Sequence, residues 1–101
     1  MKTSKVIITD LAKTDIRKAK EYYKNLNANL AKQFLNRIRE SKSFISESPN
    51  ANDVIYQDIR IHLIKQFPYH LHYFFDVDRD VIVVLAVEFA KRDNLDFSDR
   101  K

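Results

Sequence analysis

The chain has 101 residues and a formal net charge of +4, and it contains neither glycine nor cysteine. The lack of glycine excludes a phosphate-binding P-loop and a dinucleotide-binding glycine fingerprint, and the lack of cysteine excludes disulfides, thiol nucleophiles and cysteine-based zinc sites. We expect one domain over residues 1–101 with a single core, and a cytoplasmic location without membrane contact, since no apolar run approaches the roughly 20 residues of a membrane span.

The pattern of the first half predicts a short strand and two helices. Residues 5–9 are mostly β-branched, which favours a strand, and Asp10 follows as a candidate helix cap. Apolar residues then recur at steps of three and four through residues 12–26, which marks one face of a helix. Asparagines within residues 25–29 predict a break, and a second helix is expected over residues 29–47, ending before Pro49. Two amphipathic helices joined in this way predict a helical hairpin.

The second half changes to the period of strands. Residues 59–64 and 70–75 alternate, and residues 81–89 are nearly all apolar, as in a central strand buried on both faces. Phe67-Pro68 predicts a corner, and the polar residues 76–80 predict a turn that joins the last two strands. The order β-α-α-β-β-β predicts an α+β fold, with the helical hairpin packed on one face of a small antiparallel sheet. In the polar tail, we expect Phe97 to fold back on the core.

The alternation also predicts which strand residues face away from the helices. The residues expected on the helix side are Ile59, Ile61 and Leu63 in one strand and Leu71, Tyr73 and Phe75 in the next. The residues between them would then form one polar surface, consisting of Arg60, His62, His70 and His72. Lys91 and Arg92 follow the last strand and could flank this surface.

Such a cluster of imidazole, guanidinium and ammonium groups suits more than one role. It can bind phosphates or a partner, with Arg60, His62, His70, His72, Lys91 and Arg92 as the candidate contacts. It can also cleave RNA, if one group removes the 2′-hydroxyl proton, another protonates the leaving oxygen, and cations stabilise the phosphorane. An ordinary solvent-facing side of a sheet carries the same residue types. We expect no cofactor and no metal, because only His62 could join His70 and His72 as a histidine ligand.

The charge is divided unevenly along the chain. Residues 1–50 carry eleven Lys and Arg against five Asp and Glu, a net +6, whereas residues 51–101 carry seven against nine, a net −2. The basic helices indicate either an anionic partner or a solvated face. Since the predicted polar surface lies in the half with net charge −2, the total charge alone is a weak indication of nucleic-acid binding.

Four fragments occur in a characteristic order after the helical hairpin: Ile59-Arg60, Phe67-Pro68-Tyr69, the hairpin of residues 71–87, and Lys91-Arg92-Asp93. Together with the first strand and the helices, over residues 5–100, they resemble the RelE/ParE superfamily of bacterial toxins. The resemblance implies a toxin of a type II toxin–antitoxin system, acting in plasmid stabilisation or growth arrest. It also implies a cognate antitoxin, encoded beside the toxin, that covers its functional surface.

The superfamily implies one of two activities. RelE-like members enter the ribosomal A site and cut mRNA without a metal, whereas ParE-like members bind DNA gyrase and block it without chemistry of their own. Carried over to this chain, the basic strand positions of RelE fall on Arg60, His62 and His70, and its later arginine falls on Arg92. Its catalytic tyrosine falls near Phe97, which has no hydroxyl to donate or accept a proton.

The branch is predicted from smaller features. The Phe-Pro-Tyr corner, the longer last strand and the missing tyrosine favour ParE, although Phe89 and Ala90 stand where many ParE-like sequences have histidine and glycine. We therefore expect a gyrase-binding, non-catalytic toxin. The alternative is a RelE-like ribosome-dependent mRNA endonuclease, with the ribosome and mRNA as partners. A third interpretation is a degenerate, non-toxic member that keeps the antitoxin interface.

Overall fold

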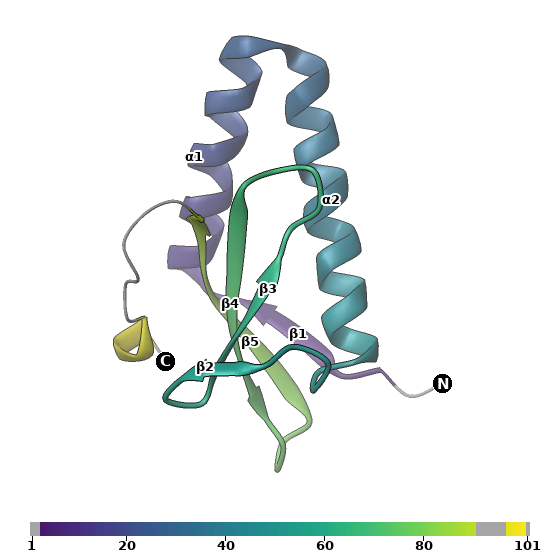
Figure 1. Ribbon diagram of the computed structural model, residues 1–101, viewed down its shortest axis with the longest axis vertical. Helices are drawn as coiled ribbons and strands as arrows, with labels where there is room; N and C mark the ends of the chain where they lie inside the picture. The colour runs from purple at the N-terminus through teal and green to yellow at the C-terminus, as the bar shows by residue number, and fades with distance from the viewer. Residues whose placement is uncertain (1–2, 91–96, 101) are drawn as a thin grey trace.

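The computed structural model describes residues 3–90 and 97–100, with the helical hairpin on one side of a twisted sheet (Figure 1). The elements in chain order are β1 (Lys5–Ile8), α1 (Asp10–Leu26), α2 (Ala28–Glu47), β2 (Val54–Tyr56), β3 (Ile59–Leu63), β4 (Tyr69–Asp76), β5 (Val81–Phe89) and the short 3-10 helix η1 (Ser98–Arg100). The predicted order of helices and strands is confirmed, and β2 and η1 are additions to it. Neither helix in this part of the chain is long and apolar enough to cross a membrane.

The five strands form one sheet in the order β1-β5-β4-β3-β2. β2, β3, β4 and β5 pair antiparallel in sequence, as expected for a meander. β1 pairs parallel to β5, with Lys5 opposite Val81 and Ile8 opposite Val84, so the sheet is mixed and the expectation of a wholly antiparallel sheet is wrong for this strand. Residues 9–80 connect β1 to β5, and only strands joined by a tight turn are forced to run antiparallel.

The helices begin and end through side-chain caps. Thr9 caps α1, because its side-chain oxygen accepts a hydrogen bond from the Ala12 N–H at 3.1 Å, and Asp10 is the first helical residue rather than the cap. Asn27 ends α1 and begins α2: its N–H donates to the Tyr23 carbonyl at 2.8 Å, and its side chain accepts from the Asn29 N–H at 2.8 Å. The predicted break is therefore a single residue in extended conformation.

A chain without glycine must place other residues where a turn needs a left-handed backbone. Positive φ angles occur at Gln57 (49°), Gln66 (74°) and Asp80 (54°). Each costs of the order of 1 kcal/mol relative to glycine. Asp80 ends the turn predicted at residues 76–80, and its carboxylate accepts a 2.6 Å hydrogen bond from the Ser4 hydroxyl, which ties the turn to the start of β1.

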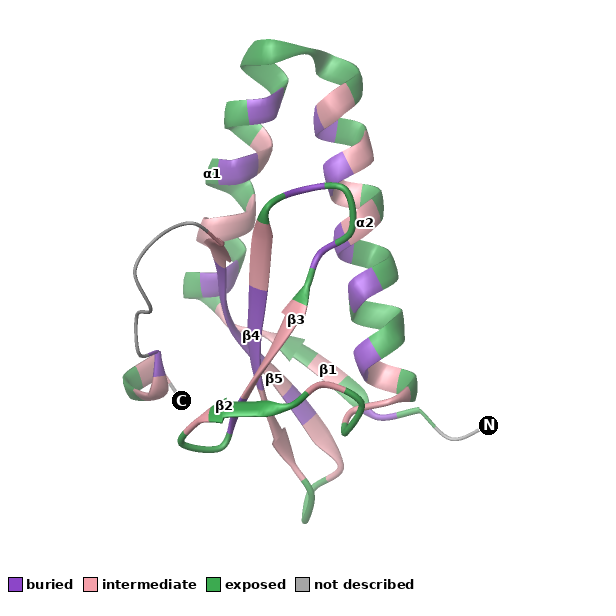
Figure 2. Ribbon diagram, viewed as in Figure 1, coloured by how far each residue is buried: buried purple, intermediate pink, exposed green. Residues whose placement is uncertain are grey.

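The main core lies between the helices and the sheet, where Figure 2 shows buried positions on the facing sides of both layers. Its largest fully buried side chains include Phe34 and Ile45 from α2, Tyr73 from β4, and Ile82 from β5. A smaller buried group outside this core contains Ile59, Leu85, Ala86 and Phe97. Phe97 is 8% exposed, which confirms that it folds back onto the protein.

Candidate functional site

β3 turns its side chains to the faces opposite to those that the alternation predicted. Arg60 is paired with Tyr73 and His62 with Leu71, and directly paired residues of antiparallel strands project to the same face. Tyr73 and Leu71 belong to the core under the helices. Arg60 and His62 therefore lie on the helix side, and the prediction that they share the open face with the two histidines of β4 is wrong.

The physical reason is that pairing with β4, rather than burial, decides the register of β3. β3 lies next to the sheet edge, and only Ile59 of its apolar residues is completely buried. Leu63 is 65% exposed and Ile61 is half-buried. Burial of these two side chains therefore contributes little free energy towards either orientation of β3. A shift of one residue exchanges the two faces of a strand, and here the ladder with β4 set that shift.

Arg60 binds the loop that joins α2 to β2. Its guanidinium donates to the carbonyl oxygen of Asn52 and, at 3.1 Å, to the side-chain oxygen of Asn50. On the same face, the Tyr73 hydroxyl donates to the carbonyl of Pro49 at 2.7 Å. These bonds satisfy loop carbonyls that no strand or helix pairs, so Arg60 has a structural role in holding residues 49–52.

His62 is fixed against the same loop and against α2. Its ring stacks on Phe44 with the centroids 5.1 Å apart, and its Nδ1 lies 3.3 Å from the side-chain oxygen of Asn52. Burial lowers the pKa of His62, because an apolar surrounding disfavours the imidazolium. A neutral, stacked ring with Nδ1 as the donor accounts for this geometry.

The two histidines of β4 do lie on the open face, as predicted. His72 is paired with Ile61 and His70 with Leu63, and the two imidazoles are 6.3 Å apart. They differ in exposure: His70 is half-buried, whereas His72 is only 4% exposed. Of the four strand residues predicted to form one polar surface, the structure therefore brings together these two and separates Arg60 and His62 from them.

His72 is covered by the C-terminal segment. The Phe97 ring lies 4.9 Å from its imidazole, the Phe97 N–H donates to the Tyr56 hydroxyl at 3.1 Å, and that hydroxyl lies 3.0 Å from Nδ1 of His72. Burial, and then the charges of His70 and Arg100, lower the pKa of His72 to about 4. The ring is therefore neutral near pH 7, with Nδ1 placed to accept the Tyr56 proton.

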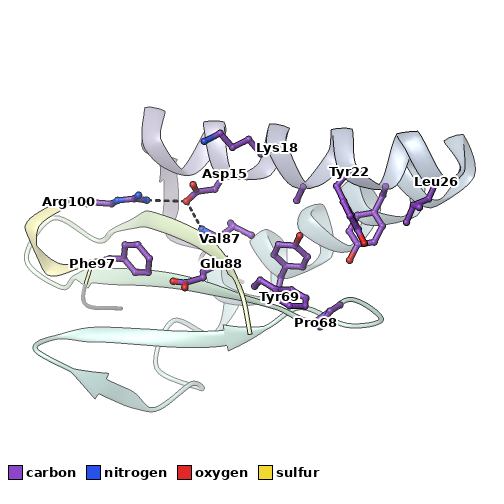
Figure 3. A pocket seen from close by; sticks show the side chains of 13 residues that line it. Asp15, Lys18, Tyr22, Leu26, Pro68, Tyr69, Val87, Glu88, Phe97 and Arg100 are labelled. Carbon is purple, nitrogen blue, oxygen red and sulfur yellow. Dashed lines mark hydrogen bonds and ion pairs between the residues drawn. The ribbon is translucent and has the colours of Figure 1, made fainter. Parts of the chain in front are cut away.

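A side-chain ion pair closes the edge of β5 beyond the end of β1. The last β1 residue to pair is Ile8, opposite Val84. Further along, Arg100 donates to the Leu85 carbonyl at 3.2 Å, and Asp15 of α1 accepts from the Val87 N–H at 3.1 Å. Arg100 and Asp15 bind each other at 3.1 Å (Figure 3). The pair thus replaces a strand at this edge and holds the tail to the sheet. Sequence reasoning missed it, because no local signal links residues 85 positions apart.

A pocket of about 670 Å³ opens between α1 and the ends of β4 and β5 (Figure 3). Its lining is partly aromatic and includes Tyr22 from α1 and Tyr69 from β4. The carboxylate oxygens of Glu88 are buried beside it. The sequence did not predict this pocket, since its lining comes from α1, the corner before β4, β5 and the tail.

Two of the predicted site residues, Lys91 and Arg92, lie outside the described residues. Within the described ranges, no group of three or more histidine, aspartate or glutamate side chains lies close enough to hold a metal ion.

Comparison with known proteins gives the family. The family model of the ParE toxin of type II toxin–antitoxin system, parDE, matches residues 6–94. A search of curated proteins gave no match. The fold is similar to that in the chromosomal ParDE system of P. aeruginosa, at a TM-score of 0.77 and 16% identity, covering 88% of this chain and 98% of that one.

Two other solved structures have the same fold at lower agreement. The intact RelBE toxin–antitoxin complex of E. coli gives a TM-score of 0.59 at 22% identity, covering 88% of this chain and 99% of that one. The RelBE2 complex of Mycobacterium tuberculosis gives 0.57 at 17% identity, covering 86% and 98%. The expected RelE/ParE fold is confirmed, and with the family model matching residues 6–94, the chain belongs to the ParE family of toxins from type II toxin–antitoxin systems.

Proposed function

We propose that this chain is a toxin that inhibits DNA gyrase by binding to it, without chemistry of its own, and that a cognate antitoxin neutralises it. The observation that carries the proposal is the separation of the basic strand residues. Arg60 and His62 lie on the helix side, where they bind the loop after α2, while His70 and His72 lie on the open face. This arrangement favours a binding surface rather than an acid–base catalytic centre.

RNA cleavage needs an acid and a base within hydrogen-bond reach of one ribose and phosphate. Among the described residues, the positions carried over from RelE do not meet this requirement. Arg60 and His62 are bound to a loop on the helix side, away from His70. On the open face, His72 next to His70 is buried and neutral. Phe97, near the position of the catalytic tyrosine, has no hydroxyl and packs on His72. A non-catalytic toxin does not require these groups to lie close together.

The antitoxin part of the proposal rests on family membership. The similar solved structures from E. coli and M. tuberculosis are toxin–antitoxin complexes. The chain is also similar to the isolated E. coli RelE toxin, at a TM-score of 0.59 and 21% identity, covering 90% of this chain and 88% of that one. Coexpression with the product of a short neighbouring reading frame tests this part. We expect the two proteins to copurify as a complex and the growth arrest caused by the chain alone to disappear.

A supercoiling assay tests the gyrase part. The purified chain is added in increasing amounts to gyrase, ATP and relaxed plasmid, and we expect supercoiling to fall with dose and to return when the antitoxin is added. A parallel reaction with a topoisomerase that only relaxes DNA controls for general inhibition by a basic protein. Full supercoiling at a large molar excess of the chain would contradict the proposal.

A ribosome-dependent mRNA endonuclease is the second candidate, and the placement of His70 on the open face favours it. A translating extract with a labelled message tests it, with the chain compared to the double variant His70→Ala, Arg92→Ala. Site-specific cleavage that this variant loses, while its circular dichroism is unchanged, would establish the nuclease. A message that stays intact in the translating extract would exclude the nuclease. Absence of any growth arrest, with the antitoxin complex still formed, would instead identify a non-toxic family member.

A further inference from the structure

One side of α1 carries a continuous row of positive charge. Lys13, Arg17, Lys20 and Lys24 are spaced by four, three and four residues, which places their side chains on one face of the helix. We call these four residues the α1 basic stripe. Three of them are exposed and Lys20 is partly exposed, and Figure 2 shows exposed positions recurring along this helix. At a rise of 1.5 Å per residue, the stripe is about 16 Å long.

The stripe is not neutralised by neighbouring carboxylates. In the described part of the chain, the ion pairs of arginine and lysine involve Arg37, Arg79 and Arg100, and none involves the stripe. Asp15 projects to the other flank of α1, where it binds Arg100. The carboxylates closest to the stripe along α1 are Asp10 and Glu21, and neither forms an ion pair with it.

The sequence of α1 lets the helix carry this row of like charges. Within the stripe, three like-charge pairs at i, i+3 and i, i+4 each destabilise a helix by about 0.2–0.5 kcal/mol. Asp10 and Glu21 stand at the same spacings from Lys13, Arg17 and Lys24, and pairs of opposite charge at these spacings offset that cost. Lys24 lies in the last turn, where the macrodipole favours a cation. The helix is therefore stable with a basic face, and such a face is suited to an anionic partner.

We propose that the α1 basic stripe binds the phosphate backbone of double-stranded DNA. A duplex presents phosphates at about 3.4 Å per strand along its axis, so a rigid row of about 16 Å faces several of them at once. The aromatic residues of α1 are Tyr22 and Tyr23, and both line the pocket, whereas proteins that hold single strands stack bases on aromatic side chains. Tyr22, the exposed aromatic residue of α1, lies on the pocket flank instead. Lysine and arginine contacts to phosphates carry no sequence information, so this binding is independent of sequence.

This surface is separate from the proposed inhibition of gyrase, and its test uses only the purified chain and DNA. Fluorescence anisotropy of a labelled duplex of arbitrary sequence measures the affinity between about 50 and 200 mM salt. Four phosphate contacts predict a slope of log K against log salt of about −3 to −4, because each contact contributes about −0.9. This amounts to a loss of roughly a hundredfold in affinity over that range of salt.

The decisive variant removes the stripe while keeping the helix. K13Q/R17Q/K20Q/K24Q should lower the affinity at about 50 mM salt by more than about tenfold and bring the slope near zero. Glutamine has nearly the helix propensity of lysine and arginine, so circular dichroism should be unchanged. The half variants K13Q/R17Q and K20Q/K24Q should each reduce the slope by about 2, which provides a readout that does not depend on the fourfold variant.

A matched control removes the same amount of charge from exposed positions elsewhere, at Lys5, Lys42, Lys65 and Arg79. It should retain the slope and most of the affinity. Three results would overturn the proposal: a slope near zero for the unchanged chain, equal losses in the stripe and control variants, or tighter binding to a single-stranded oligonucleotide than to the duplex. Gyrase inhibition can succeed or fail in its own assay without affecting these results.

Discussion

His72 illustrates how the same side chain can be a candidate binding contact in the sequence and a packing residue in the structure. His72 is 4% exposed and contacts the Phe97 ring and the Tyr56 hydroxyl. Its pKa of about 4 results mainly from burial, with the nearby charges of His70 and Arg100 adding to the effect. The ring is therefore charged in the unfolded chain at mildly acidic pH but neutral in the folded one.

This difference predicts a loss of stability in acid. Since the folded-state pKa lies below the ordinary 6.5, the unfolded state binds the proton more tightly, and the His72 contribution falls as the pH drops from about 6.5 towards 4. Between pH 7 and about pH 5, this amounts to about 2 kcal/mol of unfolding free energy. Urea unfolding of the chain and of His72→Phe at both pH values measures it.

The variant keeps an aromatic ring against Phe97 but cannot titrate. Its unfolding free energy should therefore fall less than that of the unchanged chain over the same pH interval, by about 2 kcal/mol. The comparison is a difference of differences, so it is insensitive to the packing cost of the substitution itself. Equal pH dependence in the two proteins would show that His72 titrates alike in the folded and unfolded states, which would contradict the prediction.

At the scale of elements, the connection between the helices depends on one residue. Asn27 ends α1 and caps α2, with its side-chain oxygen 2.8 Å from the Asn29 nitrogen. Its φ of −170° is extended backbone, which any residue can adopt. The function of the side chain is therefore to accept a hydrogen bond rather than to permit an unusual conformation. Substitution by alanine and by glycine distinguishes these two roles.

We expect Asn27→Ala to lower the unfolding free energy by about 1 kcal/mol and Asn27→Gly by only a few tenths, because glycine leaves the cap accessible to water. Urea unfolding at neutral pH measures both. Asn25→Ala is the control, since Asn25 is an exposed residue of the same segment within α1. If Asn27→Ala matched this control, the capping bond would contribute nothing to stability.

The local elements were predictable from the sequence, and the pairing of strands was only partly so. Both helices and β1 agree with their expected bounds to within two residues, because periodicity and caps are short-range signals. β2 was missed: it has three residues, and its register with β3 is irregular. The face of β3 was predicted wrongly, since its ladder with β4 decided the register.

The same limit applies to the candidate site. The open-face position of His70 and His72 follows from the alternation of β4, in which Leu71 and Tyr73 on the opposite face are deeply buried. Arg60 and His62 were misplaced together with their strand. The pair of Asp15 and Arg100 could not have been predicted, because it needs the final position of α1, the β5 edge and the tail at once.

At the scale of the whole molecule, the helices cover one face of the sheet, and the last residues of the chain cover part of the other. Phe97 packs on His72 of the open face, while Arg100 reaches Asp15 of α1 and lies 4.6 Å over the Phe97 ring. The tail therefore connects the two sides of the sheet through one ion pair. The side chains of Arg100 and Asp15 are 24% and 23% exposed, so water screens this ion pair only in part.

This connection predicts that Asp15 stabilises a residue that it does not contact. Arg100→Ala should speed hydrogen exchange of the Phe97 amide, which is bonded to Tyr56, by about tenfold or more, corresponding to about 1.4 kcal/mol of local opening. Asp15→Ala should act on the same amide through Arg100, and the double variant should add little further, because both remove one link. The amide of Ile64, bonded to Tyr69 at the other end of the sheet, serves as the reference, and its exchange rate should be unchanged.

Two outcomes would contradict this prediction. Additive effects of the two substitutions on exchange of the Phe97 amide would mean that the tail and α1 stabilise the sheet independently. An unchanged exchange rate of the Phe97 amide in Asp15→Ala would show that the ion pair does not hold the tail.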